Sequence, residues 1–206
     1  MDWTSIYLKT SDLNVFILGT GEVATRRANR FLDHGANVRL AGNDLSSDLK
    51  SKGAQLCPTD DVDELVEWAD LVVAASGDKG LSDYVCNIAD GKLVNRADLP
   101  QEGDVIVPTS FSIGDVEISI FTNGKSPLMA RQLRKKIQSV ITDEDILEIE
   151  LQGYARSKLK DVVTNQKERR KILYEIFEDE NINDFIKNGE IDEAKNHIDN
   201  LVRGLN

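Results

Sequence analysis

The sequence predicts an α/β protein, with a parallel-sheet domain first, a small α+β segment next and a helical domain at the C-terminus. Over residues 1–112, short apolar runs alternate with helix-compatible stretches, which is the pattern of βαβ units. A glycine pair follows directly on the first apolar run, and the chain from residue 127 onward has a helical pattern. We therefore expect three parts, covering residues 1–112, 113–143 and 144–206.

Five apolar runs in the first part have the length and composition of strands. Several are apolar on both faces, as in a parallel sheet that helices cover on both sides. The expected strands cover residues 13–19, 37–42, 54–57, 70–76 and 92–95. Expected helices lie between them at residues 22–34, 45–52, 61–68 and 79–90.

The pattern changes after Leu99. Two further strands are expected at residues 103–111 and 114–124, each entered through a Gly-Asp pair. Ser126 and Pro127 are the residue types preferred at a helix N-cap and at the first helical position. Helices are expected at residues 127–141, 144–155 and 156–178, followed by two short acidic helices within 181–203.

The composition is that of a globular, acidic protein. Its formal net charge of −11 argues against general nucleic-acid binding, because phosphates require clustered Lys and Arg. No apolar run approaches the roughly 20 residues needed to cross a bilayer. The N-terminus lacks a signal-peptide pattern, so we expect no membrane segment and a cytoplasmic location. Cys57 and Cys86 lie outside any metal-binding spacing, so no metal site is expected.

Residues 19–24 read GTGEVA and lie between an expected strand and an expected helix. In that context Gly19 would make the tight turn, and Gly21 would let the backbone approach a pyrophosphate at the helix N-terminus. Ala24 is small enough for close packing of the helix on the strand. The loop indicates a Rossmann-type dinucleotide-binding domain, and a glycine turn without a ligand is the alternative.

Asp44 follows the expected second strand, where an acidic residue would accept hydrogen bonds from the adenosine ribose. A carboxylate there repels a 2′-phosphate, so NAD is favoured over NADP, and only Arg26, Arg27 and Arg39 weigh against that preference. The residues expected to bind the cofactor are Gly19, Thr20, Gly21, Glu22, Val23, Asn43, Asp44, Ser76 and Asn95.

Residues 154–158 read YARSK, and Tyr154 and Lys158 match the Tyr-x-x-x-Lys spacing of short-chain dehydrogenases. A lysine at that spacing lowers the tyrosine pKa for proton transfer. The pair falls in the helical C-terminal part, and the glycine loop is spaced differently from that of short-chain dehydrogenases. We therefore interpret the match as coincidental.

Two stretches carry a family resemblance. One is ILGTGEVATRRANRFLDHGANV, residues 17–38, and the other is VNRADLPQEGDVIVPTSFSIGDVEISIFTNGKSPLMARQLRKKI, residues 94–137. The second joins an Asn-x-x-Asp step, a proline-containing strand, a Gly-Asp strand and a Gly-x-Ser-Pro-x-x-Ala-Arg helix start. Together they resemble the precorrin-2 dehydrogenase and sirohydrochlorin ferrochelatase family, a module also found within siroheme synthases. Residues 168–177 resemble the same family more weakly.

The resemblance implies NAD-dependent oxidation of precorrin-2 to sirohydrochlorin in siroheme biosynthesis, by a homodimer built through the segment after the nucleotide domain. The family's catalytic aspartate falls on Asp98. Asp98 also follows the expected strand at residues 92–95, at the sheet edge where ligands bind, and a carboxylate there can act as a general base. The alternative is an aspartate that only caps the turn before Pro100.

A basic stretch from residue 125 to 136 contains no acidic residue. Precorrin-2 carries eight carboxylates, which Lys and Arg pair with well. We expect Lys125, Ser126, Arg131 and Arg134 to bind the substrate, Ser126 through the amides of the helix that it starts. A solvated basic helix face or a dimer contact is the alternative.

Two other functions stay open at this point. One is a chelatase that inserts iron or cobalt into sirohydrochlorin, alone or together with the oxidation. The other is a non-catalytic module that senses NAD. Neither His34 nor His197 lies in a motif that would help chelation.

Overall fold

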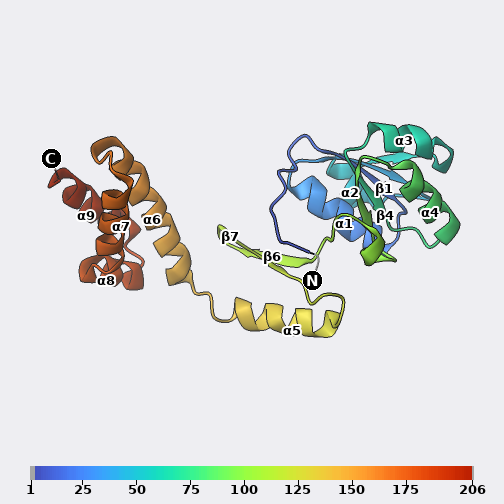
Figure 1. Ribbon diagram of the computed structural model, residues 1–206. Helices are drawn as coiled ribbons and strands as arrows, with labels where there is room; N and C mark the ends of the chain where they lie inside the picture. Colours follow the sequence, from blue (N-terminus) through green and yellow to red (C-terminus); the bar gives the residue numbers. More distant parts are fainter. Residues whose placement is uncertain (1–2, 206) are drawn as a thin grey trace. The chain divides into compact units, whose positions relative to one another are not determined.

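The computed structural model describes residues 3–205 and divides into two compact units (Figure 1). The first ends at Val107 and the second begins at Pro108. The division thus falls earlier than the boundary expected after residue 112, because the strand Thr109–Ile113 (β6) pairs with Val116–Ile120 (β7) in the second unit. The further boundary expected after residue 143 stays a prediction.

The first unit holds a parallel sheet in the strand order β3-β2-β1-β4-β5. Its strands are β1 (Asn14–Leu18), β2 (Asn37–Ala41), β3 (Gln55–Cys57), β4 (Leu71–Ala74) and β5 (Leu93–Arg96). The intervening helices are α1 (Glu22–Asp33), α2 (Ser47–Ser51), α3 (Val62–Trp68) and α4 (Lys79–Ile88), with short 3-10 turns η1 (Thr59–Asp61) and η2 (Pro100–Glu102). The predicted fold class, a Rossmann-type parallel sheet followed by a helical region, is confirmed.

Alternate side chains of β1 enter two different cores. Val15 and Ile17 pack in one cluster with α1 and α2, whereas Phe16 and Leu18 pack in another with α3 and α4. All four side chains are at most 1% exposed. Burial on both faces explains why the central strands are continuously apolar instead of alternating with polar residues.

The segment between β5 and β6 was expected to be part of a strand from residue 103. Residues 103–107 instead lie against β5 without joining the ladder, through the backbone N–H groups of Asp104 and Val105, which both donate to Val94. The prediction of a strand at residues 103–108 is therefore wrong. Strand pairing begins only at Thr109, where β7 supplies a partner.

The second unit begins with the antiparallel hairpin of β6 and β7, against which helix α5 (Pro127–Gln138) packs. Ser126 caps α5 as predicted, since its Oγ accepts a hydrogen bond from the Met129 N–H at 3.1 Å. Pro127 occupies the first helical position.

Four further helices share one apolar core. They are α6 (Asp143–Val162), α7 (Gln166–Phe177), α8 (Glu180–Asn188) and α9 (Ile191–Arg203). The predicted break between residues 155 and 156 is wrong, because Leu151, Ala155 and Leu159 form one buried stripe along an uninterrupted α6. The break lies at residues 163–165 instead, where Asn165 caps α7.

Candidate active site

Four loops of the first unit meet at the edge where the parallel strands end. Three backbone hydrogen bonds join them, from Gly19 to Ala41 at 2.8 Å, from Ala75 to Leu18 at 2.9 Å and from Ala97 to Ala74 at 2.9 Å. The loops therefore lie in the order β2, β1, β4, β5 along this edge. In an open α/β sheet, ligands bind at this edge, beside the point where the strand order reverses.

The glycine loop fits an anionic ligand. Gly21 is the N-cap of α1, and no side chain caps the first-turn amides of Glu22 and Val23. A β-carbon built on Gly21 would meet nothing within 4 Å. Helix amides that face open space and lack a side-chain acceptor suit a pyrophosphate, so these residues fit the dinucleotide that the sequence predicts.

Thr20 occupies the space beside Gly42 at the end of β2. A β-carbon on Gly42 would lie 2.7 Å from Thr20 Cγ2 and 2.8 Å from its Oγ1. Gly42 thus lets the glycine loop close onto the neighbouring strand. Gly42 is not among the residues predicted for the site, although the Gly-Asn-Asp run of residues 42–44 is a signal for it.

Asp44 and Asn43 lie exposed in the loop after β2. The Asp44 Oδ1 accepts hydrogen bonds from Lys50 Nζ at 3.0 Å and from the Leu45 N–H at 2.7 Å. The hydrogen bond from Lys50 lowers the pKa of Asp44 below its usual value, with the Leu45 amide as the next cause. Asp44 is therefore an exposed anion two residues after Gly42, which lies beside Thr20 of the glycine loop. Its contact with a cofactor stays a prediction.

Ser76 and Asn95 come from β4 and β5. Ser76 follows β4, and its Oγ accepts a hydrogen bond from the Asp78 N–H at 2.9 Å. Asn95 lies within β5 and is only 1% exposed, and its Nδ2 donates to the Val105 carbonyl at 2.6 Å. Its Oδ1 is buried without a hydrogen-bond partner among residues 3–205. In this structure Asn95 ties residues 103–107 to the sheet, and direct contact with a cofactor stays a prediction.

Asp98 lies in the loop after β5, at the same edge as the glycine loop. Only β4 separates β5 from β1, so the two strand ends are about 10 Å apart, two strand spacings. The Asp98 side chain is 34% exposed and receives two hydrogen bonds from Arg96. An accessible carboxylate therefore lies within the length of a dinucleotide from the glycine loop.

Arg96 is the last residue of β5, and three carboxylates surround its guanidinium. Its Nε and Nη2 donate hydrogen bonds to Asp98, and its Nη1 donates to Glu102 at 2.9 Å. Nη1 also forms an ion pair with Asp83, at 2.8 Å. The hydrogen bonds from Arg96 hold the pKa of Asp98 below its usual value, although burial opposes them. Asp98 is consequently ionised at neutral pH. Arg96, Asp83 and Glu102 are not among the residues predicted for the site.

The predicted substrate-binding residues belong to the second unit. Lys125, Arg131 and Arg134 are exposed, and none forms an ion pair with another residue in the range 3–205. The Arg134 guanidinium lies 5.3 Å from the centre of the Phe111 ring. These cations are available for carboxylates, and their contact with substrate stays a prediction.

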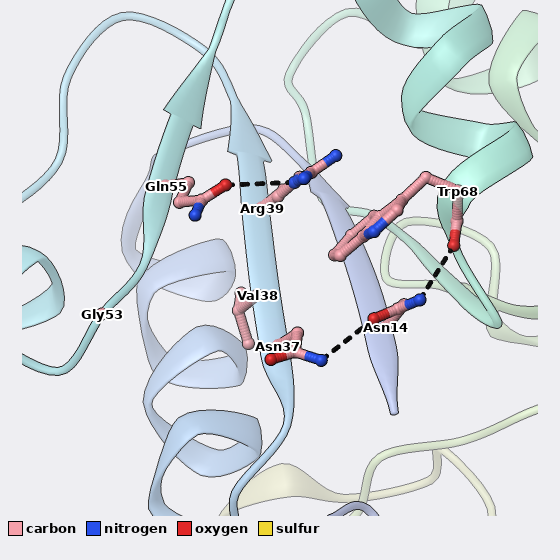
Figure 2. Close-up of a pocket in the computed structure, with 7 residues that line it drawn as sticks. All are labelled: Asn14, Asn37, Val38, Arg39, Gly53, Gln55 and Trp68. Carbon is pink, nitrogen blue, oxygen red and sulfur yellow. Dashed lines mark hydrogen bonds between the residues drawn. The ribbon is translucent and has the colours of Figure 1, made fainter. Parts of the chain in front are cut away.

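A hollow lies at the opposite edge of the sheet, where β1 and β2 begin (Figure 2). It has a volume of about 270 Å³ and is lined by Asn14, Asn37, Val38, Arg39, Gly53, Gln55 and Trp68. Figure 2 shows the hydrogen bonds of its polar side chains. Arg39 donates to Gln55, Asn37 donates to Asn14, and Asn14 donates to the backbone carbonyl of Trp68. Arg39 also lies 4.1 Å above the Trp68 ring. The polar residues that line this hollow are thus hydrogen-bonded to one another, and the hollow lies away from the glycine loop.

The YARSK pair has a structural partner. Tyr154 donates a hydrogen bond to Asp199 of α9 at 2.9 Å, and Lys158 lies 3.1 Å from the same carboxylate.

The histidine and the cysteines considered for metal binding have other surroundings. His197 contacts Asp179 within the helical bundle at 3.2 Å. Cys57 and Cys86 are free thiols, and burial raises the pKa of each. Within residues 3–205, no group of three His, Cys, Asp or Glu is arranged to hold a metal ion.

None of the helices in the described range is long and apolar enough to cross a bilayer. The cytoplasmic location expected from the sequence stays a prediction.

Comparison with known proteins agrees with the fold and the glycine loop. A family described as "Putative NAD(P)-binding" matches residues 6–109. The chain is 31% identical over 190 residues to a precorrin-2 dehydrogenase of Methanosarcina barkeri, covering 86% of this chain and 84% of the relative. It is 28% identical over 196 residues to a protein of Methanocaldococcus jannaschii named "Putative precorrin-2 dehydrogenase", covering 88% and 93%.

A solved structure described as SirC, precorrin-2 dehydrogenase, has the same fold, with a TM-score of 0.75 at 20% identity over 96% of this chain and 100% of that one. A siroheme synthase of Mannheimia succiniciproducens is 25% identical over 205 residues. The chain covers 97% of its own length in that match but only 43% of the synthase.

The sheet order, the open glycine loop and the family match define a dinucleotide-binding protein that uses a nicotinamide cofactor. Within that class, the chain belongs to the precorrin-2 dehydrogenase family.

Proposed function

We propose that the protein oxidises precorrin-2 to sirohydrochlorin with NAD as the hydride acceptor. The main support for this function is the ionised Asp98 carboxylate, which lies at the same sheet edge as the glycine loop. A family name alone does not assign the chemistry, whereas an accessible base beside a dinucleotide site supports it.

The reaction removes a hydride and a proton from the macrocycle, so a pair of electrons leaves with the hydride. NAD supplies the electron-pair acceptor when it is bound. Asp98 takes the proton, because its carboxylate is ionised and 34% of its side chain is accessible. The amides of Glu22 and Val23, with Gly21 leaving space for approach, hold the pyrophosphate.

The preference for NAD over NADP follows from Asp44, whose negative charge repels a 2′-phosphate. The arginines that weighed against this preference have other partners. Arg39 lies over Trp68 at the opposite edge of the sheet, and Arg27 donates to the Val107 carbonyl at 3.1 Å. Arg26 lies 3.9 Å from Glu22.

The substrate carboxylates are held by the exposed cations Lys125, Arg131 and Arg134, together with the amides that Ser126 begins. Leu128 of the same helix is 65% exposed and Met129 is 49% exposed. These apolar side chains support a homodimer formed through α5, since apolar surface is stabilised by burial against a second copy. Sedimentation should therefore give twice the chain mass of 22.9 kDa, whereas a monomer would contradict this part of the proposal.

The test is turnover of precorrin-2 by purified protein, without oxygen, with NAD, NADP or no cofactor. We expect sirohydrochlorin and NADH in equal amounts with NAD. Asp98→Ala should lower kcat by about 10²- to 10⁴-fold, the range for loss of a general base, and leave NAD affinity unchanged. Asp90→Ala is the control, since exposed Asp90 precedes β5 at the opposite edge.

Three results would contradict the proposal. Normal turnover by Asp98→Ala would remove Asp98 from the mechanism. Insertion of iron or cobalt into sirohydrochlorin, without oxidation of precorrin-2 by either cofactor, would identify a chelatase. NAD binding with neither reaction would identify a sensing module.

A further inference from the structure

Arg96 is a buried cation beside the proposed base. Its side chain is only 5% exposed, and an unpaired guanidinium in that environment would be strongly destabilising. Its three carboxylate partners come from different elements, namely Asp83 from α4, Asp98 from the loop after β5 and Glu102 from η2. Arg96 therefore joins three segments of the candidate site.

The three contacts are not equivalent. Asp98 receives the fork of Nε and Nη2, at 3.2 Å to Oδ1 and 2.7 Å to Oδ2. Asp83 and Glu102 share the remaining nitrogen, Nη1. Two parallel hydrogen bonds fix the plane of a carboxylate, whereas one hydrogen bond leaves it free to rotate. Among the three acids, only Asp98 is thus held in one orientation.

We propose that Arg96 positions Asp98, by gripping both oxygens so that the carboxylate presents a fixed edge to the reacting carbon. This inference rests on the function proposed above. Asp83 and Glu102 have a supporting part, because the ion pair with Asp83 and the hydrogen bond that Glu102 accepts from Nη1 hold the guanidinium itself in place. Arg96 acts through Asp98 and is not itself a catalytic residue.

Arg96 also sets the charge around Asp98. The groups facing this cluster are the carboxylates of Asp83 and Glu102 and the Cys86 thiol of α4. Without Arg96, Asp98 would lie beside two like charges and lose its main hydrogen-bond donor. Both changes raise the pKa of an aspartate, so its ionised form would be lost at a higher pH than in the natural protein.

The first experiment uses the full chain with Arg96→Lys, which keeps the charge but not the fork. We expect kcat for precorrin-2 oxidation to fall by about 10- to 100-fold, because a base misplaced by about 1 Å costs about that factor. KM and NAD affinity should change less than about threefold, since neither ligand is held by Arg96. Arg156→Lys, on the exposed face of α6, is the control for the same exchange elsewhere.

A double-mutant cycle adds Asp98→Glu, a variant in which Arg96 itself is unchanged, and tests directly whether the two residues act together. Asp98→Glu keeps a carboxylate near Arg96, so the guanidinium stays paired. Its longer side chain, however, cannot keep the two parallel hydrogen bonds from Nε and Nη2 in their natural geometry. If Arg96 positions Asp98, the double variant Arg96→Lys, Asp98→Glu should be no slower than the slower single variant. If the loss of kcat in the double variant equals the product of the losses in the two single variants, the two residues act independently and the inference is overturned.

A measurement without catalysis separates this inference from the proposed function. The ¹³C chemical shift of the Asp98 carboxyl carbon should titrate at higher pH in Arg96→Met than in the natural chain. An unchanged titration, or natural kcat in Arg96→Lys, would overturn the positioning role. Absence of precorrin-2 oxidation by the natural chain, with the titration shifted, would instead overturn the proposed function alone.

Discussion

Gly19 lies so close to Ala75 that a β-carbon on Gly19 would be 2.5 Å from the Ala75 carbonyl oxygen. Gly19 also has φ of +110°, a conformation that residues with a side chain rarely adopt. The turn after β1 and the residue after β4 therefore pack backbone against backbone. This contact lies at the position where the strand order of the sheet reverses.

Gly19→Ala and Gly21→Ala should separate the folding role of the loop from its ligand role. Gly19→Ala should lower the free energy of unfolding by about 2–4 kcal/mol, through the strained φ and the clash with Ala75. Gly21→Ala should change it by less than about 1 kcal/mol, because its φ is −73° and its surroundings are open.

Gly21→Ala should instead weaken NAD binding by about tenfold or more, since the methyl group keeps the pyrophosphate from the helix amides. Thermal unfolding and calorimetric titration with NAD measure the two effects. Equal stability loss in both variants, or unchanged NAD affinity in Gly21→Ala, would contradict the placement of the pyrophosphate.

Asp44→Ala tests the ribose contact. We expect NAD affinity to fall by about tenfold, the effect of losing hydrogen bonds to a charged acceptor, and the preference for NAD over NADP to narrow. Asp48→Ala is a matched control, because it removes one exposed carboxylate from α2 that pairs with Lys52 instead. Equal effects of both substitutions would point to overall charge and not to the ribose.

Tyr154→Phe tests whether the YARSK spacing has any catalytic meaning. The substitution removes the hydrogen bond to Asp199, which keeps Lys158 as a partner. The free energy of unfolding should fall by about 0.5–1.5 kcal/mol, while turnover of precorrin-2 stays unchanged. A large loss of kcat without loss of stability would show that the tyrosine takes part in the reaction.

The sheet domain was predictable because its signals are local. Each central strand is apolar on both faces, as Phe16 and Ile17 illustrate, and a glycine pair follows the first strand. The helical C-terminal part was predictable in class but not in its boundaries. Residues 155 and 156 carry no signal that opposes helix. The break at residues 163–165 has a local signal that was overlooked, since Asn165 is a preferred N-cap residue and its side chain caps α7.

The candidate site was predictable only in part. Gly19, Gly21 and Asp44 could be located because each has a fixed spacing from a recognisable strand end. Arg96 was not identified, although its partners Asp98 and Glu102 follow it closely in the sequence. Its burial, to 5% exposure, and its ion pair with Asp83 at 2.8 Å arise only in the folded domain. The burial of a guanidinium in the folded protein has no local signature in the sequence.

The strand order also determines when, during synthesis, the cofactor loop can be completed. Gly19 leaves the ribosome early, but the carbonyl that closes its turn belongs to Ala75. Until residues 71–74 follow, β1 has only β2 as a parallel neighbour. A nascent chain that ends before β4 therefore contains the complete GTGEVA motif but lacks the Ala75 backbone, which packs against Gly19 in the folded protein. We therefore expect a chain that ends before residue 75 not to bind a dinucleotide.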